Sequence, residues 1–331
     1  MEKAAFICGQ TVIYWDSLIL ALAIAAGIFA FLSLYCKNSN HTITAACGVV
    51  MTLVLSAMLG RLIHWYSRTD SYPDFRTAML DHSVGSYALA GVFLACLITA
   101  AVLVLFRLCR DLPRLLDCAA LGVGIGIAVG RLSFFFNSSD RGLIVPASWP
   151  LPLGSSVINP VSGVTETRLA TFLLQSIVTG LIVAVLLLRA SPKRKRPLAS
   201  GDVCLLFLAW YCCSQIFFDS TRYESLFLRS NGFISIVQIL SAVGLVTAMV
   251  FFTVPLFALQ KKKFFVLWLL FLAFTGGAGF MEYYVQRHGD QAGFAYSVMI
   301  LCLTAMAIVA TMAHGSTRKA PAKKAGKFLR Q

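Results

Sequence analysis

Residues 13–30 read IYWDSLILALAIAAGIFA, an almost unbroken apolar run. Similar runs recur along the chain, and their length of about 18 residues or more suits helices that cross the hydrocarbon core of a bilayer. Of the 331 residues, 58% are apolar and 13% are charged, whereas about 25% of residues in a soluble domain are charged. A membrane β-barrel would show short segments of alternating hydrophobicity instead. The sequence therefore predicts an all-α, polytopic helical membrane protein.

About nine transmembrane helices are expected. Their ranges are 17–35, 43–66, 85–107, 113–136, 169–189, 202–219, 233–259, 264–285 and 292–314. The longest loop, about 137–168, is rich in Pro, Gly and Ser. We expect three parts: a membrane domain over 1–259, an additional two-helix membrane segment over 260–314, and a basic cytoplasmic tail over 315–331.

Basic residues indicate the orientation of these helices. If the N-terminus lies outside, the inner loops and the tail hold 18 of the 28 Lys and Arg residues, including the runs at 193–196 and 261–263. The positive-inside rule therefore predicts an outside N-terminus and an inside C-terminus. The net charge of +14 is then explained by topology and by attraction to anionic membrane lipids, so no nucleic-acid partner is expected.

Cysteines and histidines give no sign of a metal site. Most of the ten cysteines lie inside apolar runs, where they act as small hydrophobic residues, and no C-x-x-C pair occurs. The five histidines are scattered. We expect neither a metal nor a cofactor.

The tripeptide Gly-Arg-Leu occurs at 60–62 and again at 130–132, each time near the predicted outer end of a helix. A single arginine there can be an anchor that extends to the lipid headgroups. Two equivalent arginines, together with Asp219 and Arg222 at the end of the sixth helix, favour an anion site instead. Arginine binds phosphate through two parallel hydrogen bonds, and the phosphate of a membrane belongs to a phospholipid. The residues alone predict a phospholipid-headgroup site near the outer face.

The stretch GRLSFFFNSSDRG at 130–142 resembles the signature of the prolipoprotein diacylglyceryl transferase family. It keeps six of the nine specified positions, namely Gly130, Arg131, Phe135, Phe136, Asn137 and Gly142. It departs at Ser133, Phe134 and Ser139, although Asp140 follows the last of these. Three further stretches, at 13–30, 60–66 and 210–222, resemble family motifs in the same order, so the resemblance covers roughly 10–258.

The resemblance implies an activity and its partners. The family transfers the diacylglyceryl group of phosphatidylglycerol to the lipobox cysteine of a prolipoprotein signal peptide in the bacterial cytoplasmic membrane. It implies that Arg131 holds the phosphate and that Asn137 orients the headgroup. The other residues that it implies at the headgroup are Arg61, Gly130 and Gly142, with supporting roles for Tyr211, Gln215, Asp219 and Arg222.

Three motif departures concern the chemistry. Ser86 stands in place of the family histidine, Gln215 in place of an arginine, and Thr171 in place of a glutamate. The candidates for the catalytic base are therefore Ser86, His82 and Asp16. Three functions stay open: a divergent transferase with weakened activity, a non-catalytic relative that binds phospholipid or lipoprotein precursor, and a lipid transporter.

A reporter fused after Gln331 tests the predicted orientation. Because the basic residues concentrate on one side, we expect the reporter to be active only in the cytoplasm. Activity outside the cell would show that the number of membrane crossings is not odd or that the N-terminus lies inside.

Overall fold

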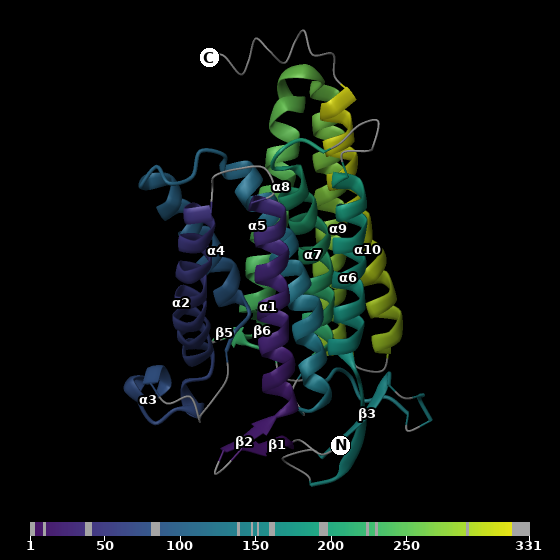
Figure 1. The fold of residues 1–331 in the computed structure, drawn as a ribbon. Coiled ribbons are helices and arrows are strands. Elements are labelled where there is room, and N and C mark those ends of the chain that lie inside the picture. The colour runs from purple at the N-terminus through teal and green to yellow at the C-terminus, as the bar shows by residue number, and fades with distance from the viewer. Residues whose placement is uncertain are drawn as a thin grey trace. The chain divides into compact units, whose positions relative to one another are not determined.

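The computed structural model describes residues 4–8, 11–36, 42–80, 87–137, 140–146, 148–150, 152–158, 163–191, 198–222, 225–228, 231–288 and 291–319. The α-helices are α1 (Trp15–Tyr35), α2 (Thr42–Ser67), α3 (Phe75–Leu80), α4 (Ala90–Leu105), α5 (Leu112–Gly130), α6 (Thr171–Ala190), α7 (Asp202–Thr221), α8 (Ile236–Leu259), α9 (Lys261–Arg287) and α10 (Ala292–Lys319). Two 3-10 helices are η2 (Thr69–Ser71) and η3 (Arg131–Phe135). The strands are β1 (Ala4–Cys8), β2 (Thr11–Tyr14), β3 (Gly154–Ile158), β4 (Thr165–Leu169), β5 (Phe227–Leu228) and β6 (Asn231–Ser235), and they form three antiparallel pairs in chain order (Figure 1).

Within the described residues, eight helices are long and apolar enough to cross a membrane: α1, α2 and α5 to α10. The prediction of an all-α polytopic membrane protein is confirmed. Helix α4 is a shorter apolar helix at the position of the third expected span, 85–107. Just before this helix, the backbone N–H of Ala88 donates to the carbonyl oxygen of Gly60 in α2 at 3.0 Å. The orientation of the termini stays a prediction.

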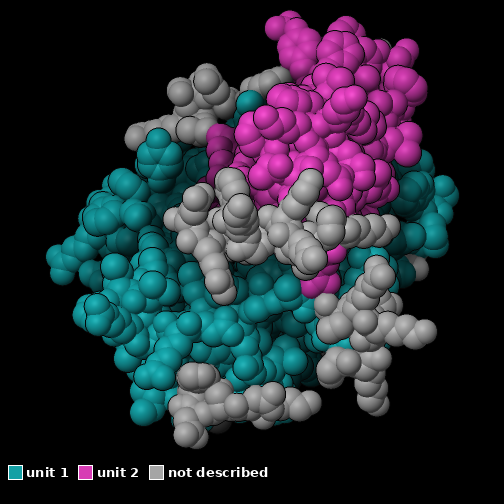
Figure 2. All heavy atoms as spheres, turned by 90° about the horizontal axis from the view of Figure 1, so that it is seen from above, with its two compact units in different colours: residues 1–204, 221–236 teal, residues 205–220, 237–331 magenta. Residues whose placement is uncertain are grey.

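The chain forms two compact units, coloured separately in Figure 2. Unit 1 comprises residues 1–204 and 221–236, and unit 2 comprises residues 205–220 and 237–331. The expected boundary between residues 259 and 260 stays a prediction. Most of the expected basic tail, residues 320–331, lies outside the described residues.

In unit 1, helices α1 and α5 lie side by side (Figure 1) and pack against each other at glycines. A Cβ atom built on Gly27 would lie 2.8 Å from the carbonyl oxygen of Gly122, and one on Gly122 would lie 2.8 Å from that of Gly27. Small residues at such crossings let two helix backbones approach closely. The two helices run in opposite directions, since a Cβ on Gly130, the last residue of α5, would contact Leu20 and Ala23 near the start of α1. The start of α1 therefore lies beside the end of α5.

In unit 2, side-chain hydrogen bonds connect α9 and α10 to α7 and α8. The indole N–H of Trp210 donates to Thr311 Oγ1 at 3.1 Å, and the indole N–H of Trp268 donates to Thr253 Oγ1 at 3.1 Å. The hydroxyl of Ser220 donates to Glu282 Oε2 at 2.5 Å. Because lipid cannot replace these partners, the bonds favour one packing of the four helices. The two C-terminal helices are thus integral to this unit.

The contact between Gly91 and Gly60 in unit 1 leaves no room for a side chain. A methyl group on Gly91 would overlap the backbone N and Cα of Gly60, whereas a methyl group on Gly276 in α9 would meet no atom within 4 Å. We expect Gly91→Ala to lower the free energy of unfolding by about 1–3 kcal/mol through overpacking. Gly276→Ala should leave it unchanged or raise it slightly. Thermal unfolding of both variants in detergent measures the difference, and equal midpoints would contradict the close approach.

Candidate functional site

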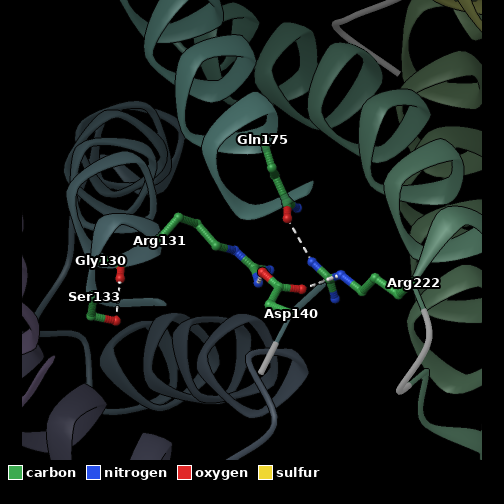
Figure 3. Close-up of polar contacts among 6 residues, drawn as sticks. All are labelled: Gly130, Arg131, Ser133, Asp140, Gln175 and Arg222. Carbon is green, nitrogen blue, oxygen red and sulfur yellow. Dashed lines mark hydrogen bonds and ion pairs between the residues drawn. The ribbon is translucent and has the colours of Figure 1, made fainter. Parts of the chain in front are cut away.

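The carboxylate of Asp140 lies between two arginines in unit 1 (Figure 3). Its Oδ2 is 2.5 Å from Arg131 Nη1, and its Oδ1 is 2.5 Å from Arg222 Nε. The exposed fractions of the three side chains are 5% for Asp140, 9% for Arg131 and 12% for Arg222. A carboxylate that is paired with two guanidinium groups and removed from water forms strong charge-assisted hydrogen bonds. This arrangement fixes the positions of both arginines.

Arg131 is placed by the change from α5 to the tighter helix η3. The hydroxyl of Ser133 donates to the carbonyl oxygen of Gly130 at 2.7 Å, one turn back (Figure 3). Two aromatic contacts hold the segment on either side. The ring of Phe136 stacks on Trp15 of α1 at 5.9 Å, and the ring of Phe135 meets Phe172 of α6 edge-on at 4.7 Å. These contacts hold the backbone segment that carries Arg131, and the ion pair with Asp140 orients its side chain.

Arg222 directly follows the last residue of α7 and has a second partner besides Asp140. Its Nη2 donates to Gln175 Oε1 of α6 at 2.5 Å (Figure 3). Gln175 is fully buried, and a buried amide is held in place when its hydrogen-bonding groups are paired. The start of η3, the N-terminal part of α6 and residue 222 thus supply one polar cluster.

Gly142 lies where the chain leaves this cluster. Its N–H donates to the carbonyl oxygen of Leu169 at 2.8 Å, and a Cβ atom there would overlap Thr171 Oγ1. The carbonyl oxygen of Gly142 accepts a bond from Arg168 Nη1 at 3.3 Å, and Arg168 is paired with Glu166 at 2.6 Å. Close packing around its backbone gives a structural reason for glycine at this signature position.

The cluster carries more positive than negative charge. Arg131, Arg141 and Arg222 interact electrostatically with one carboxylate, Asp140. Burial on its own would raise the pKa of Asp140, but the charges of Arg131 and Arg222 outweigh burial and hold this pKa below its usual range. Burial lowers the pKa of Arg141, and the charge of Asp140 opposes that effect. Counted over these four described residues, three guanidinium groups and one carboxylate give a formal excess of two positive charges, which suits the binding of an anion.

The structure places the other predicted headgroup residues in different surroundings. Arg61, in α2, donates from Nε to the carbonyl oxygen of Ala78 at 2.8 Å, and its guanidinium lies 5.3 Å from the ring centroids of both Tyr72 and Tyr87. Asn137 follows η3, and its carbonyl oxygen accepts a bond from Arg141 Nη2 at 3.1 Å. The role of both residues at a headgroup stays a prediction.

The remaining predicted residues divide among the two units and the undescribed segments. Asp16 lies in the first turn of α1, next to Trp15, and its Oδ1 accepts a bond from the N–H of Ser17 at 2.7 Å. His82 and Ser86 lie outside the described residues. Tyr211, Gln215 and Asp219 are buried residues of α7 within unit 2.

Three residues of the cluster are absent from the predicted site: Gln175 of α6, and the neighbouring pair Asp140 and Arg141. Both lie inside the 130–142 stretch, so a count of charged residues there would have pointed to them. Gln175 had no such signal, because a single amide in an apolar helix is common.

The paired carboxylate makes the stability of unit 1 depend on pH. Since the pKa of Asp140 is lowered in the folded protein, its stabilising effect is complete above the unfolded value of about 3.9 and is lost as the pH falls below it. We expect Asp140→Asn to destabilise the protein by about 3–5 kcal/mol at neutral pH, because it leaves buried cations uncompensated. Thermal unfolding between pH 3 and pH 8 measures this difference, which should narrow below about pH 4. The exposed Asp70 provides the control Asp70→Asn, and an equal loss in both variants would contradict the result.

Comparison with known proteins gives the family. A family model described as prolipoprotein diacylglyceryl transferase matches residues 3–254. The phosphatidylglycerol–prolipoprotein diacylglyceryl transferase of Bacillus licheniformis is 25% identical over 256 residues, which cover 74% of this chain and 92% of that protein. The enzyme of the same name from Shouchella clausii is 27% identical over 245 residues, 72% of this chain and 86% of that protein. One from Clostridium botulinum is 24% identical over 264 residues, 79% of this chain and 100% of that protein. This chain therefore belongs to the prolipoprotein diacylglyceryl transferase family.

Proposed function

We propose that this protein transfers the diacylglyceryl group of phosphatidylglycerol to the lipobox cysteine of prolipoproteins, in the cytoplasmic membrane of a bacterium. One observation carries the proposal beyond family membership. It is the buried cluster in which Asp140 holds Arg131 and Arg222 at 2.5 Å each while positive charge remains in excess. A multi-pass membrane protein with such a cluster is equipped to bind a lipid phosphate.

The proposed reaction replaces a carbon–oxygen bond of the lipid with a carbon–sulfur bond. The cysteine sulfur attacks the diacylglyceryl carbon that carries the phosphate ester, so that a C–S bond forms and the C–O bond breaks. The electron pair of that bond leaves with glycerol phosphate. The thiol proton passes to a base, because the thiolate is the reactive form of cysteine.

Electrostatics explains why two excess positive charges help. The lipid phosphate is a diester with one negative charge, and the departing monoester carries about −1.5 to −2 at neutral pH. Negative charge therefore grows as the C–O bond breaks. Guanidinium groups already held in position stabilise that growing charge more than they stabilise the bound lipid, which is the condition for faster chemistry.

Asp140 serves in this proposal as a positioning residue. Its lowered pKa makes it a weak acceptor of the thiol proton at neutral pH. The proposed bases are Asp16, His82 and Ser86. Of these, Asp16 is next in sequence to Trp15, whose ring stacks on that of Phe136, the residue after η3, and this contact supports Asp16 as a candidate.

Transfer of a labelled diacylglyceryl group from phosphatidylglycerol to a lipobox peptide tests the proposal. We expect Arg131→Lys and Arg222→Lys each to lower kcat/KM by about 10²- to 10³-fold, since lysine keeps the charge and loses the planar pair of donors. Arg76→Lys, an exposed residue of α3, is the matched control.

Lipid retained by the purified protein, measured by native mass spectrometry, separates two outcomes. If the wild-type protein transfers nothing but retains phosphatidylglycerol, and Arg131→Ala loses it, the protein is a binding relative without catalysis. The substitutions Ser86, Gln215 and Thr171 at family motif positions are what favour that second function.

A further inference from the structure

Arg141 has hydrogen-bond donors that the protein does not use. Its side chain is buried, with 8% of the residue exposed. Nη2 donates to the carbonyl oxygens of Phe134 at 3.0 Å and Asn137 at 3.1 Å. Nε and Nη1 are buried and have no hydrogen-bond partner among the described residues. Three N–H bonds of a permanent cation are therefore left without an acceptor.

Buried N–H donors without an acceptor raise the free energy of the folded protein unless a ligand supplies the acceptor. An unpaired buried donor loses its hydration without replacement, and the loss is larger when the donor is charged. The ring of Phe172 lies 4.4 Å from the guanidinium carbon and stabilises the cation through its face. A ring face cannot accept the in-plane N–H bonds, which still require an oxygen.

The neighbouring carboxylate does not supply that oxygen. Both oxygens of Asp140 are engaged in ion pairs, one with Arg131 and the other with Arg222. Glu166, whose partner Arg168 bonds to the carbonyl oxygen of Gly142, is engaged by that arginine. The counter-charge for Arg141 must therefore come from outside the described protein residues.

We propose that Arg141 forms a subsite for a phosphate monoester, through Nε and Nη1, and thereby makes the site favour the departing glycerol phosphate over the lipid diester. This inference rests on the proposed function. Arg131 and Arg222 with Asp140 carry a net charge of +1, which matches a diester. Adding Arg141 raises the net charge to +2, which matches a monoester dianion. The third arginine thus compensates the charge that appears only as the C–O bond breaks.

The wild-type protein provides the first test. Isothermal titration calorimetry of the full chain in detergent measures the affinity for three ligands. Two of them, sn-glycerol phosphate and inorganic phosphate, can carry two negative charges, whereas the diester glycerophosphoglycerol carries one. We expect the monoester and inorganic phosphate to bind about 10- to 100-fold more tightly than the diester, as expected for an additional charged hydrogen-bonding group. Equal affinity for monoester and diester would overturn the inference without any variant.

Two variants then assign the preference to Arg141. Arg141→Gln should remove most of the preference for the monoester, and Arg141→Lys should restore only part of it, because lysine keeps the charge and lacks the guanidinium geometry. Retention of phosphatidylglycerol, measured by native mass spectrometry, should change less than monoester binding in both variants. The exposed Arg76→Gln is the control and should keep the wild-type preference.

A purely structural role would give a different result. If Arg141 only holds the carbonyl oxygens of Phe134 and Asn137, Arg141→Gln lowers the unfolding midpoint and weakens monoester and diester binding equally, which overturns the inference. If Arg141→Gln fails to fold, the ratio of monoester to diester affinity in the wild-type protein and in Arg141→Lys still tests the inference.

The outcomes also separate this inference from the proposed function. Transfer activity in the wild-type protein with an unchanged monoester preference in Arg141→Gln rejects the subsite and leaves the function standing. No transfer by the wild-type protein, with a monoester preference that depends on Arg141, rejects the transferase and supports the subsite.

Discussion

The paired ionic contact of Asp140 with Arg131 and Arg222 is the constraint on which the rest of the site depends. Two guanidinium groups cannot lie together in a weakly hydrated environment without a counter-charge, since their repulsion and their lost hydration both oppose it. One carboxylate, 2.5 Å from each arginine, offsets the repulsion between the two guanidinium groups and part of their lost hydration. It also sets the direction of both side chains before any ligand arrives, which is the preorganisation that electrostatic catalysis requires.

The position of this carboxylate shows how a chain that departs from a motif can still place an acid beside the arginines of that motif. The family signature specifies an acid at 139, where this chain has serine, and the acid in this chain is one residue later. The backbone of Asp140 has a φ of +60°, a left-handed conformation that Asp adopts more readily than most residues. This turn directs the side chain towards both arginines. The loss of the glutamate at 139 therefore does not leave the arginines without a counter-charge.

Composition and hydrophobic runs predicted the helices well, because membrane crossing imposes one length and one kind of side chain. The expected spans 17–35 and 43–66 correspond to α1 (Trp15–Tyr35) and α2 (Thr42–Ser67). The third expected span, 85–107, corresponds to the shorter helix α4 (Ala90–Leu105). The hairpin of β3 and β4 was not anticipated, as each strand is only five residues long and the loop that contains it is rich in turn-forming residues.

The site was harder to predict because ion pairing depends on backbone turns that leave little trace in a sequence. Arg131 lies in a recognisable signature. The ion pairs of Asp140, by contrast, depend on the left-handed backbone conformation of that one residue. The partnership of Arg222 with Gln175 joins positions 47 residues apart, and no spacing rule connects them. The paired Gly-Arg-Leu motifs suggested equivalent arginines, yet Arg61 lies between tyrosine rings and Arg131 beside a carboxylate. Local repetition thus carried no information about the partners of each side chain.

An excess of buried positive charge opposes folding, so its presence needs a reason other than stability. Replacing buried ionic groups with apolar ones of similar volume often stabilises a protein. A cluster with three guanidinium groups and one carboxylate is therefore expected to be maintained by what it binds. Binding of an anion would supply the missing counter-charge and stabilise the folded state, by an amount that rises with the logarithm of the ratio of ligand concentration to dissociation constant. Under the proposed function, the charge imbalance that weakens the empty site would strengthen phosphate binding, most of all when the phosphate carries its second negative charge. The excess positive charge thus lowers the stability of the fold and would favour the proposed anion binding. Asp140 limits the loss of stability because it neutralises one of the three cations, and two positive charges remain for the proposed ligand.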